Sequence, residues 1–141
     1  MCDGLRPVGA KIWLVICAAG DRTDEILHGF AYRAARVADH VAIAELLHYL
    51  RGRDREDLFE RLVAGVKDGG AIEVDVYADE LAGLRGVFAR STRGDVIGVT
   101  ALGMRGEVFA WLEEAGARRL MPARVKQMVR RASSATEEKG R

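Results

Sequence analysis

The stretch IWLVICAAGDRT, residues 12–23, decides the fold class of this sequence. Every residue from Ile12 to Ala18 is apolar and several are β-branched, which is typical of a strand covered on both faces in a parallel sheet. Polar residues then interrupt the run, and either Asp21 or Thr23 is placed to cap a following helix. We therefore predict a β-strand that leads through a short loop into an α-helix.

The same order of strand and helix repeats along the chain. Helical spacing of apolar residues predicts helices over residues 26–38, 54–67, 79–92 and 106–115. Two further runs predict strands, over residues 71–78 and 95–101. The segment from His40 to Leu50 fits either a strand that ends near Leu46 or a continuation of the preceding helix. We adopt the strand because it completes a regular repeat.

The predicted strand over residues 71–78 alternates in polarity, unlike its neighbours. We expect Ile72, Val74 and Val76 to face inward. The residues between them, Glu73, Asp75 and Tyr77, then form a wetter face, and this places the strand near an edge of the sheet.

The alternating order predicts an α/β three-layer sandwich, with an open parallel sheet and a Rossmann-like or flavodoxin-like winding. We divide the chain into an N-terminal extension (1–10), one α/β domain (11–132) and a polar, flexible tail (133–141). Ligands of such folds bind beyond the carboxyl ends of the strands, where the strand order reverses. That rule selects four segments, residues 18–23, 45–48, 77–79 and 100–106.

Composition limits the classes of function that fit this chain. The chain has 141 residues and a formal net charge of +1, so we expect one domain and no general affinity for nucleic acid. Its two cysteines, Cys2 and Cys17, form no metal or disulfide pattern, which favours a reducing, cytoplasmic location. No apolar run approaches the roughly 20 residues of a membrane-spanning helix.

Three glycines after the predicted strand 95–101 are candidates for a phosphate site. Gly103, Gly106 and Gly116 have the spacing G-x2-G-x9-G. Such glycines let backbone N–H groups approach a phosphate at the start of a helix. The alternative is that they serve as a tight strand exit and a helix C-cap.

The residues AIEVDVYADELAGLRGVFARSTRGDVIGVTALG, 71–103, resemble the third strand, third helix and Asp-led fourth strand of the universal stress protein family. The resemblance spans about residues 11–117 and includes the glycine spacing of the ATP-binding members. It implies an adenine nucleotide alpha hydrolase-like fold and a homodimer that acts in regulation or stress response. It also implies ATP or AMP as ligand, with Mg²⁺ in some members, and at most slow ATP hydrolysis.

The resemblance also implies which residues contact the nucleotide, namely Ala19, Gly20, Asp21, Thr100, Gly103, Gly106 and Gly116. Two positions depart from the ATP-binding pattern: Cys17-Ala18-Ala19 replaces an Asp, and Ala117 replaces Ser or Thr. These departures are equally typical of members that bind no nucleotide. We predict no catalytic residue and no metal ligand, because the three histidines lack metal-ligand spacing.

Two other functions stay open. Residues 66–86 resemble the middle of the DsrE sulfur-relay family, in which case Cys17 would carry sulfur. The segment from Arg118 to Arg131 has six basic residues and no acid. It predicts either an adaptor for an acidic partner or an acidic membrane surface, or a terminal element that packs on a dimer mate. The sequence leaves open whether this segment is a strand or a helix. It has no aromatic residue for stacking on bases, so we do not expect nucleic acid as the partner.

Overall fold

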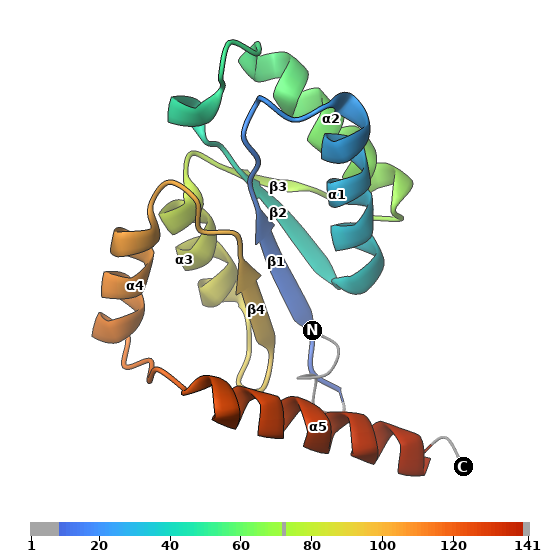
Figure 1. Cartoon of the computed structure of the whole chain (residues 1–141), viewed down its shortest axis with the longest axis vertical. Coiled ribbons are helices and arrows are strands. Elements are labelled where there is room, and N and C mark those ends of the chain that lie inside the picture. Colours follow the sequence, from blue (N-terminus) through green and yellow to red (C-terminus); the bar gives the residue numbers. More distant parts are fainter. Residues whose placement is uncertain (1–8, 72, 140–141) are drawn as a thin grey trace.

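The computed structural model describes residues 9–71 and 73–139, and most of the predicted extension 1–10 lies outside them. It confirms the α/β fold (Figure 1). In chain order the elements are β1 (Ile12–Ile16), α1 (Asp24–Val37), β2 (His40–Ala44), the 3-10 helix η2 (Leu47–Tyr49), α2 (Arg55–Asp68), β3 (Asp75–Tyr77), α3 (Glu80–Arg90), β4 (Val96–Val99), α4 (Arg105–Glu114) and α5 (Pro122–Lys139).

The sheet is open and parallel, with the strand order β3-β2-β1-β4. Helices α1 and α2 cover one face, and α3 and α4 lie on the other (Figure 1). This is the predicted three-layer arrangement. The order reverses between β1 and β4, because the chain first winds outward through β2 and β3 and then returns to the other side of β1.

Alternating side chains of β1 supply two apolar cores. Ile16 packs with Leu27, Leu62 and other residues under α1 and α2. Trp13 and Val15 pack with Val87 on the opposite face. Because consecutive residues of a strand point to opposite faces, an uninterrupted apolar run is what a strand between two helical layers requires.

Local capping explains where three helices begin. Thr23 accepts a hydrogen bond from the Ile26 N–H at the start of α1. Asp54 and Asp79 cap α2 and α3 in the same way. Thr23 was one of two predicted caps for α1, and the structure selects it over Asp21.

The predicted strand from His40 is confirmed as β2. In the predicted strand 71–78, the edge position is confirmed, and Val74 packs inward as expected. Ile72 lies outside the described residues. The expected faces of Val76 and Tyr77 are wrong. Val76 is 45% exposed, whereas Tyr77 packs against the core beneath α3. The reason lies in α3, whose glycines make room for the ring: a Cβ atom on Gly86 would overlap Tyr77, and one on Gly83 would lie 2.7 Å from Val15 Cγ1. Tyr77 therefore packs inward against α3, and Val76 of the short edge strand is exposed.

Asp95 joins the beginning of β4 to the beginning of β1. Its carboxylate accepts from the Lys11 N–H at 2.9 Å and from Trp13 Nε1 at 2.9 Å. Hydrogen bonds from the backbone of Thr92 and Lys11, and then from Trp13, lower the pKa of Asp95 to about 2. The acid at the start of the fourth strand is therefore a structural tie.

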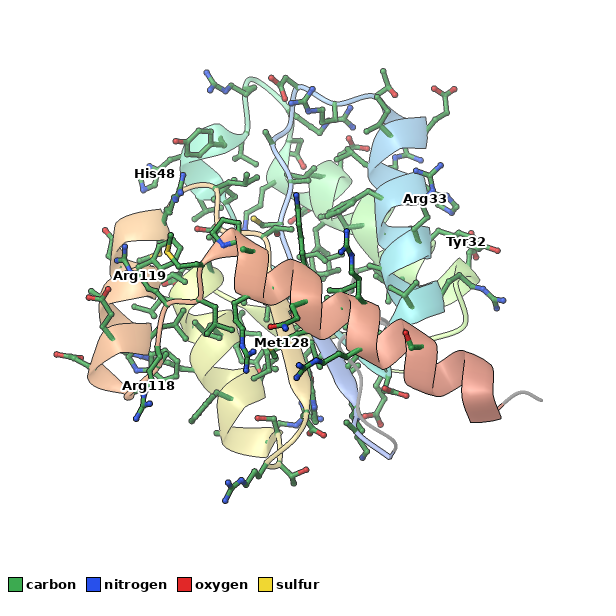
Figure 2. All side chains as sticks on the ribbon, turned by 60° about the horizontal axis from the view of Figure 1, so that its bottom comes forward. Tyr32, Arg33, His48, Arg118, Arg119 and Met128 are labelled. Carbon is green, nitrogen blue, oxygen red and sulfur yellow. The ribbon has the colours of Figure 1, made fainter. Side chains whose placement is uncertain are left out.

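The basic C-terminal segment forms helix α5, which answers the question of strand or helix. It continues to Lys139, past the boundary at residue 132 that the sequence predicts for the folded domain. The helix lies near the amino ends of the strands, apart from the two helical layers (Figures 1 and 2), and most of its described side chains are exposed. None of the helices in residues 9–71 and 73–139 is long and apolar enough to cross a membrane.

Candidate functional site

The carboxyl ends of β1 and β4 lie side by side at the point where the strand order reverses, which is the usual ligand position of this fold. Two predicted segments meet there. Thr100 Oγ1 accepts a hydrogen bond from the Cys17 N–H at 2.8 Å, and the Thr100 N–H donates to the Val15 carbonyl. The ends of the two strands are therefore held together by the Thr100 hydroxyl and by a backbone hydrogen bond.

The side chain of Glu80, from the start of α3, fills this crevice. Its carboxylate accepts hydrogen bonds from the backbone N–H groups of Leu102 at 2.5 Å and Met104 at 2.6 Å. The Gly103 N–H lies between the two oxygens, at 3.2 Å from Oε1 and 3.1 Å from Oε2. The Cys17 thiol lies 3.0 Å from Oε1. Glu80 is fully buried, and it is the only buried charged residue in the described part of the chain.

Glu80 stays ionised in this position. Burial by itself would raise its pKa, but hydrogen bonds from the Cys17 thiol and from the backbone of residues 102–104 together hold the pKa below its usual value. The negative charge is therefore stabilised by donors that converge on it.

This arrangement bears directly on the predicted phosphate site. The N–H groups that the glycine loop would offer to a phosphate already bind a carboxylate. A phosphate can reach them only by displacing Glu80. Nucleotide binding through this loop thus stays a prediction, and it now requires a movement of Glu80.

The individual glycines of the pattern have separate roles. A Cβ atom on Gly103 would lie 2.8 Å from Leu46 Cδ1, so a larger residue there would require the Leu46 side chain to move. Gly116 has φ +85° just after α4, as in a helix C-cap. Gly106 meets nothing within 4 Å. Because α4 separates Gly116 from Gly103 by about 15 Å of helix, the structure does not bring all three together.

The loop after β1 contains the other predicted contacts, Ala19, Gly20 and Asp21. Gly20 is buried, and a Cβ atom there would overlap the Leu50 carbonyl. Arg53 fixes the loop by donating to the Gly20 carbonyl at 2.9 Å and the Arg22 carbonyl at 2.8 Å. Asp21 is exposed. The structure therefore assigns Gly20 to packing and leaves Asp21 at the surface of the carboxyl edge.

Cys17 has the environment of an unreactive thiol. Burial, and then the hydrogen bond with Glu80, raise its pKa to about 12. Nucleophilic attack needs the thiolate, and Cys17 is a thiol at neutral pH. This geometry gives no support to a sulfur-relay function.

An open cleft of about 430 Å³ lies next to Glu80 at the carboxyl edge. It is lined by Glu45, Leu46, Leu47, His48, Tyr49, Ala78, Asp79, Glu80, Gly103, Met104 and Glu107. Its size lies within the range of small-molecule sites. Glu45 pairs with Arg55 at 2.7 Å, and Asp79 caps α3. Glu107 has no ion pair within the described residues, so the lining is acidic.

A tight turn borders this cleft. Arg51 and Gly52 both have positive φ, 54° and 85°, and the Arg51 guanidinium lies 5.3 Å from the centroid of the Tyr49 ring. A non-glycine residue in the left-handed region is uncommon and is enriched at ligand sites. The turn holds an aromatic ring beside the cleft.

Sequence reasoning missed the residues that organise this site, above all Glu80 and Arg53. A glutamate after a capping Asp reads as an ordinary first-turn acid. Its partners at 102–104 are more than 20 residues away and contribute only backbone N–H groups. No pattern of side chains in the sequence therefore predicts the contact.

Comparison with known proteins supplies no family. No protein-family model matches this sequence, and no curated protein does. In residues 9–71 and 73–139, no group of three or more His, Cys, Asp or Glu side chains is placed to hold a metal ion.

Proposed function

We propose that this chain is a regulatory, non-catalytic module that binds a nucleoside-like ligand in the cleft at the carboxyl edge of the sheet. The observation that carries the proposal is the cleft itself. It lies at the edge where parallel α/β sheets bind ligands, and it combines an aromatic ring, apolar walls and carboxylates.

The chemistry of the lining favours a ligand rich in hydrogen-bond donors. Ionised carboxylates only accept hydrogen bonds. The exocyclic amine of adenine and the hydroxyls of ribose can donate hydrogen bonds to the carboxylates of Glu107 and Asp79. Tyr49 and Met104 offer apolar surface for the base. Phosphate oxygens are acceptors with negative charge, so the same lining disfavours them.

This proposal keeps the adenine nucleoside of the ligand that the resemblance implies, but it expects the phosphates to weaken binding instead of strengthening it. With the loop at 102–104 closed by Glu80, affinity falls from adenosine to AMP to ATP. Stress response and the homodimer stay predictions that accompany the resemblance, and the cytoplasmic location stays a prediction from the two cysteines.

Calorimetric titration with adenosine, AMP and ATP at constant ionic strength and without Mg²⁺ tests the proposal. We expect adenosine to bind most tightly. Glu107→Gln should improve AMP affinity about twofold to fivefold by removing a nearby like charge, and Glu114→Gln, an exposed control near the far end of α4, should not. Tightest binding of ATP, or no binding of any of the three at millimolar concentration, would refute it.

A second candidate function rests on the cations of α5. Within the described residues no ion pair involves Lys126, Arg130 or Arg131. Arg53 and Arg55 of the α/β body contact carboxylates, whereas Arg33 and Arg36 of α1 have no ion pair within the described residues either. What distinguishes residues 118–131 is that six basic residues occur there without an acid. Cations without an internal partner at neutral pH are available to an acidic partner. This observation favours an adaptor that binds through α5.

Binding of fluorescent poly-L-glutamate measures this function separately. Reversal of Lys126, Arg130 and Arg131 to Glu should abolish binding, and binding should weaken steeply with added salt. Reversal of two exposed arginines of α1, Arg33 and Arg36, provides the control. Equal losses in both variants would show nonspecific attraction and eliminate α5 as a dedicated surface.

A further inference from the structure

We propose that Glu80 is a built-in anion, which permanently occupies an anion-binding site formed by the backbone of residues 102–104. The proposal does not depend on the nucleoside cleft. It assigns to this loop a preference for binding a carboxylate, and the bound carboxylate is that of the chain's own Glu80.

The geometry is that of a ligand in its site. Three consecutive N–H groups point at one carboxylate, and both of its oxygens take part. Consecutive backbone N–H groups that converge in this way form a nest for an anion. The start of α4 follows directly at Arg105, so its helix dipole also favours negative charge.

The loop packs directly on the carboxylate. A Cβ atom on Gly103 would lie 3.8 Å from Glu80 Oε2, which is van der Waals contact, so the loop backbone lies against the carboxylate. Glu80 has no exposed surface, and every buried side-chain nitrogen or oxygen in the described residues has a hydrogen-bond partner.

The contact closes the crevice where the strand order reverses. Glu80 belongs to α3, and its partners follow β4, so the carboxylate connects the two elements across the carboxyl edge. In the wild-type protein the loop is therefore closed to free oxyanions. Removal of the side chain beyond Cβ should create a site the size of acetate, because Glu and Ala differ by a CH₂–COO⁻ group.

Chemical rescue of Glu80→Ala tests this inference. Thermal unfolding is measured at pH 7 in sodium acetate and in sodium chloride of equal ionic strength. We expect acetate to raise the Tm of Glu80→Ala with a saturating concentration dependence and to slow amide exchange at residues 102–104. Wild type and Glu114→Ala, an exposed control on α4 outside the cleft lining, should show no difference between the salts.

Each result decides the question. An equal Tm of Glu80→Ala in both salts would overturn the inference. If the variant folds only in acetate, the inference is supported; if it fails to fold in either salt, it is overturned, because acetate should restore the missing contacts. Sodium phosphate in a third series shows whether the opened site accepts any oxyanion or only a carboxylate. These experiments use no nucleoside. A negative result would therefore overturn the inference about Glu80 without bearing on the proposed nucleoside binding.

Discussion

The backbone N–H of Gly103 lies between the two carboxylate oxygens of Glu80, at 3.2 Å and 3.1 Å. This relationship joins two features that the sequence presents separately, a glycine loop after a strand and an acid at the start of a helix. It explains why the loop does not offer free amides to a phosphate.

Replacement of Glu80 by Gln should destabilise the fold, although the two side chains have the same shape. The amide nitrogen is a donor and meets backbone donors, so at least one part-buried N–H loses its acceptor, at a cost of about 1–3 kcal/mol. Urea unfolding at pH 7 measures the loss, and amide exchange should accelerate at residues 102–104. Wild-type stability in Glu80→Gln would show that the carboxylate is not required.

Two glycines in adjacent helices should respond in opposite ways to alanine. A Cβ atom on Gly65 of α2 would lie 2.8 Å from the Ala31 side chain and would overlap the His28 carbonyl of α1, so Gly65→Ala should destabilise the protein by forcing the helices apart. Gly29 of α1 meets nothing within 4 Å. Gly29→Ala should stabilise by up to about 1 kcal/mol, the usual gain in a helix. Changes of the same sign in urea unfolding would contradict the packing described for α1 and α2.

Acid unfolding should report on Asp95. Its pKa is lowered from 3.8 to about 2 in the folded protein, so its stabilising contribution is complete above the unfolded pKa and is lost as the pH falls toward the folded pKa. Stability of the wild type should therefore fall between about pH 4 and pH 2. In Asp95→Asn, stability should be lower at neutral pH and should fall less steeply over this interval. Parallel pH profiles would show that Asp95 has no such role.

The thiol of Cys17 should be inert in the folded protein. Its pKa of about 12 leaves almost no thiolate at pH 8, and the residue is buried. In a Cys2→Ser background, which leaves one cysteine, Ellman's reagent should react only after addition of urea. Rapid reaction of the native protein would reopen the sulfur-relay hypothesis.

The layered fold was predictable because its signals are local. The apolar run at Ile12–Ala18, the caps and the helical spacings each indicate an element, and their alternation indicates a parallel sheet. The inward position of Tyr77 was not predictable, because it depends on the glycines of α3 that lie against it.

The candidate site was predictable only in its location. The strand order places it at the carboxyl edge, but its chemistry comes from long-range contacts. Glu80 acts on backbone groups of another loop, and Arg53 holds two carbonyls more than 30 residues away in the chain. A pattern of residue types does not contain such contacts, because the partners are main-chain atoms.

The most direct test of the proposed function is calorimetric titration of adenosine into the wild type and Ala78→Trp. Ala78 is an exposed residue that lines the cleft, so an indole there should fill the space that the ligand needs. Ala110→Trp, an exposed position on α4 outside the lining, is the matched control. We predict that adenosine binds the wild type and Ala110→Trp alike and does not bind Ala78→Trp. Equal binding to all three proteins, or binding to none, would contradict a nucleoside site in this cleft.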